Sequence, residues 1–176
     1  MKYLIILLLF SSNLVHSDEI RINQKNFNIV QDIIDSADKV GVPREILLAI
    51  CWKESSFRNK GVTHKDGPTL SHGVCQLKYE TAQWMDDLYK NSIKVTPARL
   101  ENSRINSLYA AQYLHYQLKH HHGDWASSVD AYNKGNVINV NSKYVKDVMS
   151  NYKVIKKKYQ AKIDNKPLRS WMSQYE

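Results

Sequence analysis

Apolar residues recur every three or four positions along almost all of the 176 residues, which is the spacing of one face of an α-helix. No run of alternating apolar and polar residues is long enough to demand a β-sheet. The chain is therefore predicted to fold as a mainly α protein with at most a small β-hairpin. The six expected helical segments cover residues 27–37, 43–55, 81–88, 105–118, 125–132 and 145–155.

Residues that favour helix ends mark several of these boundaries. Gly41 and Gly123 are expected to end the first and fourth segments. Pro43 suits the first position of the second helix, because its missing N–H would have no partner there. Asp124 and Ser142 carry side-chain oxygens that can cap the fifth and sixth helices.

Glu54 lies in line with the apolar face of the second segment. Leu47, Ile50 and Cys51 precede it at intervals that place all four residues on one side of a helix. Burial disfavours the charged form of a carboxylate, which makes Glu54 a candidate general acid. The alternative is that Glu54, at the last turn, points to water. From this helix alone, that alternative is the commoner case.

The helical pattern lapses between residues 58 and 72, where Gly, Pro, Asp and Asn are frequent. This composition predicts a loop with room for a small hairpin. The loop returns the chain from Glu54 to Gln76, so the two residues can face a common cleft.

The N-terminus has the composition of an export signal. Lys2 supplies a positive charge, residues 4–10 are wholly apolar, and small residues stand near Ser17. Residues 1–17 are therefore predicted to be a cleavable signal peptide, too short to span a membrane, and no later segment could cross a bilayer. The remaining 159 of 176 residues suit one domain, expected over residues 18–160, followed by a tail over residues 161–176.

The chain is basic, with a formal net charge of +8 that falls to +7 without Lys2. Its Lys and Arg residues are dispersed, which argues against nucleic acid as a partner. An anionic envelope polymer or membrane surface suits an exported protein better. A solvated basic surface that only aids solubility is an equal alternative. The basic C-terminal tail is expected to be a solvated helix end with a loosely ordered terminus, and contact with a membrane or a secretion partner is the alternative.

The sequence also raises the questions of a disulfide and of a metal site. Cys51 and Cys75 could form a disulfide after export, or could be buried free thiols. The run His120 to His122 invites a metal hypothesis, but neighbouring helical residues point in different directions and no fixed ligand spacing is present. No metal site and no cofactor are therefore expected.

Four short blocks of sequence carry a family resemblance. They are Glu-Ser-Ser-Phe (54–57), Gly-Val-Cys-Gln-Leu (73–77), Ala-Tyr-Asn-Lys-Gly (131–135) and Tyr-Val-Lys-Asp-Val (144–148). In order and spacing they resemble the signature blocks of soluble lytic transglycosylases, which belong to the lysozyme-like superfamily and are relatives of goose-type lysozyme. The resemblance runs from about residue 40 to 152. It implies a monomeric lysozyme-like domain with a cleft, exported to the periplasm or secreted, that acts on peptidoglycan glycan strands.

The resemblance also implies roles for individual residues. Glu54 matches the family's single catalytic acid, which protonates the bond between N-acetylmuramic acid and N-acetylglucosamine and then, as a base, drives closure of a 1,6-anhydro ring. Gln76 matches a cleft glutamine, and Thr63 stands where a small hydroxyl residue could polarise the N-acetyl group. Tyr132 matches a tyrosine whose hydroxyl lies near the carboxylate. Asn133 supports its loop, and Tyr144 lines the cleft.

The chain departs from the family pattern at two places. Lys78 stands where many relatives have an apolar methionine, so a cation there would alter saccharide contacts or favour an anionic peptide stem. Residues 140–143 lack the acidic residue that larger relatives often place before the last block. The absence of additional helical modules resembles the small members, some of which open the wall locally for secretion or conjugation machines.

Two other functions compete with a transglycosylase. A hydrolase of the same fold would need a second carboxylate to activate water, for which Asp66 is the candidate. A wall-binding module for secretion assembly would need little or no chemistry at Glu54.

Overall fold

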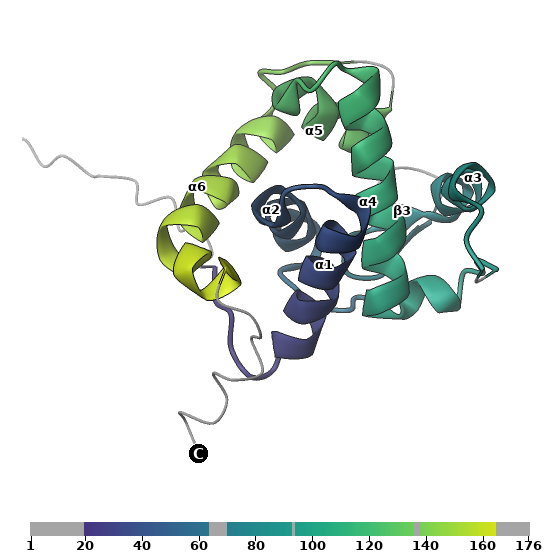
Figure 1. The fold of residues 1–176 in the computed structure, drawn as a ribbon, viewed down its shortest axis with the longest axis horizontal. Coiled ribbons are helices and arrows are strands. Elements are labelled where there is room, and N and C mark those ends of the chain that lie inside the picture. The colour runs from purple at the N-terminus through teal and green to yellow at the C-terminus, as the bar shows by residue number, and fades with distance from the viewer. Residues whose placement is uncertain (1–19, 64–69, 93, 136–137, 165–176) are drawn as a thin grey trace, which may run out of the picture.

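The structure is a computed structural model that describes residues 20–63, 70–92, 94–135 and 138–164. Within these ranges all six predicted helices are present (Figure 1). Their ends differ from the predictions by at most three residues, except that the last helix runs to Asp164, nine residues past the predicted end at residue 155. They are α1 (Phe27–Val40), α2 (Arg44–Ser55), α3 (Tyr79–Tyr89), α4 (Ser103–His120), α5 (Trp125–Lys134) and α6 (Lys143–Asp164), with a short 3-10 helix, η1 (Arg99–Glu101), before α4.

Helices α2 and α4 form the centre of the fold. Helix α4 packs against α1, α3 and α5, while α2 packs against α1 and α6 (Figure 1). Every residue from Ile46 to Cys51 is buried, so α2 is covered on all sides and has no wet face over this stretch. Helix α4 also buries polar residues, among them Asn106 and Gln112. These polar side chains therefore need partners inside the protein.

The helix ends follow the predicted chemistry with one shift. Gly41 ends α1 in the left-handed conformation at φ 82°. Asp124 accepts a hydrogen bond from the backbone N–H of Ser127, and Ser142 accepts one from Val145, so both act as N-caps. Pro43, predicted at the first helical position, is instead the extended residue just before α2, which begins at Arg44.

A three-stranded antiparallel sheet connects α2 to α3. Its strands are β1 (Val62–Thr63), β2 (Ser71–His72) and β3 (Leu77–Lys78). Thr63 pairs with Ser71, and His72 pairs with Leu77. The sheet therefore has one two-residue strand more than the predicted hairpin, because the chain turns back once more before α3. Asp66, the candidate second carboxylate of a hydrolase, lies outside the described residues.

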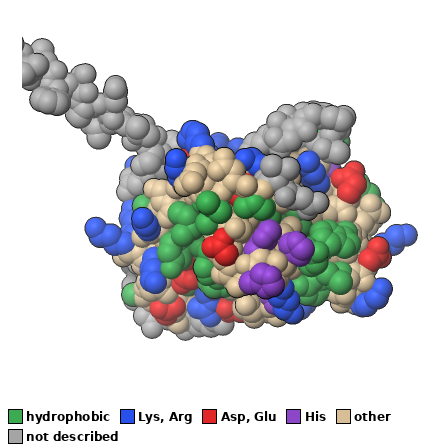
Figure 2. Space-filling view, turned by 90° about the horizontal axis from the view of Figure 1, so that it is seen from above, with side chains coloured by type: hydrophobic (Ala, Val, Ile, Leu, Met, Phe, Trp, Pro, Cys, Tyr) green, Lys and Arg blue, Asp and Glu red, His purple; other side chains and the backbone are tan. Residues whose placement is uncertain are grey.

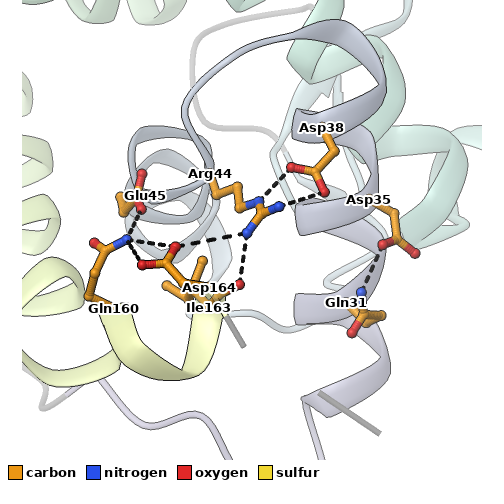
Figure 3. Close-up of polar contacts among 8 residues, drawn as sticks. All are labelled: Gln31, Asp35, Asp38, Arg44, Glu45, Gln160, Ile163 and Asp164. Carbon is orange, nitrogen blue, oxygen red and sulfur yellow. Dashed lines mark hydrogen bonds and ion pairs between the residues drawn. The ribbon is translucent and has the colours of Figure 1, made fainter. Parts of the chain in front are cut away.

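The far end of α6 is fastened to the beginning of α2. The guanidinium of Arg44 donates to the carboxylate of Asp38 at 2.9 Å and to the carbonyl oxygen of Ile163 at 2.8 Å (Figure 3). The hydroxyl of Tyr159 on α6 donates to the carbonyl oxygen of Ile20 at 2.8 Å. These contacts hold the last turns of α6, which ends at Asp164.

In the described residues, no helix combines the length and apolar character that crossing a membrane requires. The predicted signal peptide over residues 1–17 lies outside this part of the chain, as do residues 165–176 of the predicted tail.

Candidate functional site

Glu54 lies at the C-terminal end of α2 and is only 9% exposed. The helix ends directly after it, because Ser56 and Phe57 both take the left-handed conformation, at φ 57° and 56°. Phe57 is then buried and packs edge-on against Trp52, with ring centroids 5.1 Å apart. This reversal holds the carboxylate at the end of a rigid helix and not on a loop.

Tyr144, at the start of α6, donates its hydroxyl proton to Oε1 of Glu54 at 2.6 Å. Burial raises the pKa of Tyr144 well above its usual value, and the nearby charge of Glu54 raises it further. The phenol therefore stays protonated and remains a donor at neutral pH. One turn along, Lys53 of α2 pairs with Asp147 of α6 at 2.7 Å, which fixes the two helices beside each other.

The start of α6 is itself held by Asp130, a fully buried carboxylate on α5. One oxygen of Asp130 accepts the hydroxyl of Ser142 at 2.6 Å, and the other accepts the backbone N–H of Asn139 at 2.7 Å. Asp130 therefore sets the position from which α6 carries Tyr144 to Glu54. Sequence reasoning missed Asp130, although its position between the apolar residues Val129 and Ala131 was a sign of burial.

The segment from Gly73 to Gln76 forms the opposite wall of the site and approaches α4 closely. Gly73 has φ 70°, and a Cβ there would lie 2.3 Å from the carbonyl oxygen of Leu100, so no other residue fits without a shift. Gln76 has φ 47°, and its amide nitrogen donates to the carbonyl oxygen of Gly73 at 2.8 Å. Gln76 is thus buried in a fixed orientation.

Asn106, a fully buried residue of α4, holds this segment through both ends of its side-chain amide. Its oxygen accepts the backbone N–H of Cys75 at 2.8 Å, and its nitrogen donates to the carbonyl oxygen of His72 at 2.8 Å. Sequence reasoning missed Asn106 as well. A polar residue on a helix is usually solvent-exposed, and the residues next to Asn106 give no sign that a loop packs against it.

Cys51 and Cys75 form a disulfide, with their Cα atoms 4.2 Å apart. The bond joins α2, one turn before Glu54, to the residue before Gln76. Of the two alternatives left open by the sequence, the structure has the bridge. Both wall segments of the site are therefore covalently tied at their base.

Removing the disulfide should lower the free energy of unfolding by about 3 kcal/mol, because the bond closes a loop of 24 residues in the unfolded chain. The test is urea unfolding of a Cys51→Ala/Cys75→Ala double variant beside the wild type, each with and without dithiothreitol. The double variant should be insensitive to the reductant. Equal midpoints for both proteins under oxidising conditions would contradict the prediction.

A cleft of about 190 Å³ opens beside Glu54. Among the residues predicted to bind substrate, Gln76, Lys78, Tyr132 and Asn133 line it. Its other lining residues are Ser71, Leu77, Thr81, Tyr113, Lys134 and Gly135. Glu54 is the acidic residue in this described lining, whereas Lys78 and Lys134 are cations. The cleft is therefore suited to a polar, neutral or anionic ligand.

Both predicted tyrosines lie near Glu54, and their hydroxyls have different partners. The hydroxyl of Tyr132 donates to the carbonyl oxygen of Cys75 at 3.0 Å, and that of Tyr144 contacts the carboxylate directly. Burial, and then the charge of Glu54, raises the pKa of Tyr132 well above its usual value, so it too remains a donor. Thr63 belongs to β1, but its side chain lies outside the description.

The histidine run lies at the C-terminal end of α4, away from these residues. His120 stacks on Tyr116 with ring centroids 5.9 Å apart, and His121 meets His120 edge-on. Across the described ranges, no group of three or more His, Cys, Asp or Glu side chains is placed to hold a metal ion.

Comparison with solved structures supports the predicted fold. The chain is similar to an inactive variant of the lytic transglycosylase Slt from Pseudomonas aeruginosa, with a TM-score of 0.62 and 19% identity over 73% of this chain. It is also similar to the 70 kDa soluble lytic transglycosylase from Escherichia coli, with a TM-score of 0.61 and 18% identity over 74% of this chain. The chain covers 24% of each of those two chains. The likeness confirms a mainly helical, lysozyme-like fold.

A comparison with sequence families gives a match that includes the site residues. A search of curated proteins finds no match. The family model described as the transglycosylase SLT domain matches residues 31–158, a region that contains Glu54, Gln76, Tyr132 and Tyr144. Because this region is well over half of the chain, the protein belongs to the transglycosylase SLT domain family.

Proposed function

We propose that this protein is a peptidoglycan lytic transglycosylase. It would cleave the β-1,4 bond between N-acetylmuramic acid and N-acetylglucosamine without water and leave 1,6-anhydro-muramyl ends. One observation carries the proposal: in a chain of this family, Glu54 is a buried carboxylate beside a cleft in whose described lining no second carboxylate stands. Most glycosidases use two carboxylates, and a lone one suits a reaction in which a single group acts twice.

In the proposed reaction, Glu54 begins protonated. It donates its proton to the glycosidic oxygen, and the bond from that oxygen to C1 breaks as the N-acetylglucosamine end leaves as an alcohol. The substrate's own N-acetyl group assists this departure. The ionised Glu54 then removes the proton of the C6 hydroxyl, whose oxygen bonds to C1. Glu54 ends protonated, as it began, and no water is consumed.

The remaining site residues have supporting roles in this proposal. Gln76 and Tyr132, held by backbone carbonyls of the same wall segment, would bind and orient the sugar at the cleaved bond. Asn133 would contact the substrate from the rim, and Thr63 would help polarise the N-acetyl group. Lys78 would bind an anionic part of the substrate, such as a peptide-stem carboxylate.

Product analysis tests the proposal directly. Purified peptidoglycan sacculi would be digested with the protein, and the soluble muropeptides would be identified by mass spectrometry. The expected products carry 1,6-anhydro ends. Because water is not the acceptor, each product should be lighter than the corresponding hydrolysis product by one water, about 18 Da. Reducing ends in place of anhydro ends would instead identify a hydrolase, with Asp66 as the candidate second carboxylate.

Replacing Tyr144 by Phe should lower kcat roughly ten- to a hundredfold, because a hydrogen bond to a charged group contributes about 1.5–3 kcal/mol. The change removes the oxygen that meets Glu54 at 2.6 Å and keeps the ring. Initial rates on sacculi at several substrate concentrations separate kcat from KM. Tyr152→Phe on the same helix is the matched control, and a Tyr144 variant as active as that control would contradict the assigned role.

We also infer that the protein acts outside the inner membrane. The signal-like residues 1–17 support this address, and so does the disulfide, since such bonds persist in oxidising compartments. Local opening of the wall for a secretion or conjugation apparatus is the proposed setting. Fractionation of cells that express the full chain tests the address: protein found with the periplasmic or extracellular fraction, and lacking residues 1–17, is the expected result.

A further inference from the structure

A second groove lies between α3 and α4, which each also contribute one residue to the cleft lining, Thr81 and Tyr113. It has a volume of about 500 Å³ and is lined by Leu88 and Tyr89 of α3 and by Tyr116, Lys119 and His120 of α4. This volume lies in the range of small-molecule binding sites. Figure 2 shows the histidine side chains gathered on one face of the molecule beside hydrophobic side chains. The groove therefore combines apolar and cationic groups.

The groove continues the cleft along matching turns of α3 and α4. Thr81 and Tyr113 line the cleft, and Trp84 and Tyr116 follow them by three residues on the two helices. Residues three apart in a helix share a face, so both helices present the next turn to the same side. Leu88 follows Trp84 by one further turn. From Thr81 to Leu88 the helix rises about 10 Å.

Aromatic rings join the two hollows without a break. The ring of Tyr132 lies 5.4 Å from that of Tyr113, which lies 6.2 Å from Trp84. Trp84 meets Tyr116 at 4.5 Å, and Tyr116 stacks on His120 at 5.9 Å. The first rings are buried in the cleft wall, whereas Trp84 is 42% exposed and Leu88 is 51% exposed. Exposed apolar side chains that gather in this way mark a binding surface.

We propose that this surface, defined by Trp84, Leu88, Tyr116, Lys119 and His120, binds the glycan strand beyond the bond that is cut. The inference rests on the proposed function. The apolar faces of sugar rings would pack on Trp84 and Tyr116, which offer flat apolar area at low entropic cost. Carboxylates of the peptide stems would meet Lys119, the charged residue of the groove lining, together with the adjacent histidines. Continuity with the cleft and this charge favour the glycan strand over a protein partner.

The test compares binding and cleavage on long and short substrates. A Trp84→Ala/Tyr116→Ala double variant should bind sacculi about tenfold more weakly than its parent, measured by sedimentation in a Glu54→Gln background that prevents digestion. In the active background, kcat/KM should fall about tenfold on sacculi and stay within twofold on glycan fragments too short to reach from the cleft to Trp84. Tyr152→Ala, a half-buried tyrosine on α6, is the matched control.

A second variant guards against a folding defect. Lys119→Glu/His120→Glu changes only exposed side chains, and it should weaken binding to intact sacculi more than binding to glycan strands stripped of their stems by an amidase. Unchanged affinity of both double variants for sacculi would overturn the inference. An equal loss of rate on long and short substrates would also overturn the inference. Variants that bind sacculi normally but no longer bind a protein partner would overturn it as well. Because sedimentation needs no chemistry, it separates failure of this surface from failure of the proposed reaction.

Discussion

A Glu54→Gln variant is expected to lose about 10³- to 10⁴-fold in kcat for glycan cleavage, which is the upper range for a general acid–base group. The amide has almost the shape of the carboxyl group and still offers an oxygen to the hydroxyl of Tyr144. It cannot donate the proton that the leaving sugar needs, and it cannot remove one from the C6 hydroxyl. Because both proton transfers of the proposed reaction fail, we expect the loss in kcat to lie in the upper range for a general acid–base group.

The control for this experiment is Glu45→Gln, at the opposite end of the same helix. Glu45 accepts a hydrogen bond from Gln160 of α6 at 2.8 Å and lies outside the cleft lining. It should keep near-wild-type activity, and both variants should unfold at similar urea concentrations. The Glu54 variant should also still bind sacculi. If it lysed sacculi as fast as the control, Glu54 would have no chemical role, and a wall-binding module would be the better description.

An Asn106→Ala variant is expected to lose about 2–6 kcal/mol in the free energy of unfolding. The substitution leaves the backbone N–H of Cys75 and the carbonyl oxygen of His72 buried without their partner, and each such loss costs about 1–3 kcal/mol. The wall segment that carries Gln76 should also lose its fixed position. Activity should therefore fall more than tenfold even at temperatures at which the variant is folded. Urea unfolding and initial rates on sacculi measure the two effects.

Asn102 provides a matched control on the same helix. It is the exposed N-cap of α4, and its side chain accepts from the backbone N–H groups of Arg104 and Ile105. Asn102→Ala should cost only about 1 kcal/mol and leave the rate unchanged. An Asn106→Asp variant should fall between the two, because it keeps the acceptor for Cys75 and loses the donor to His72. Should Asn106→Ala prove no worse than the cap variant, the segment must be held by other contacts.

Most of the helices were predictable from the sequence because each buries one apolar face, and a period of 3.6 residues records that face directly. Helix α2 is the exception, because it is buried on all sides from Ile46 to Cys51. The caps at Asp124 and Ser142 were predictable for a related reason, since capping depends on residues within one turn. Glu54 was recognisable because a carboxylate in line with an apolar stripe is unusual. In each case the physical cause lies within a few residues of the chain, where periodicity and local chemistry can reveal it.

The contacts that fix the site were not predictable in this way, because they join distant segments. Asn106 meets Cys75 across 31 residues, and Tyr144 meets Glu54 across 90. Which tyrosine reaches the carboxylate depends on how α6 packs against α2, and no local pattern encodes that packing. Asp130 shows the intermediate case. Its burial was signalled by its apolar neighbours, but its partners Asn139 and Ser142 depended on the path of the following loop.

The long sixth helix separates the chemistry from the chain ends. Tyr144 stands at its beginning and Asp164 at its end, and twenty residues of helix span about 30 Å. Ile20, the first described residue, is bound to Tyr159 near that same remote end. Ile20 and Asp164 therefore both lie at the end of α6 that is remote from Tyr144. In both solved structures the matched region is 24% of a longer chain, so the same fold is present there as one part of a larger protein.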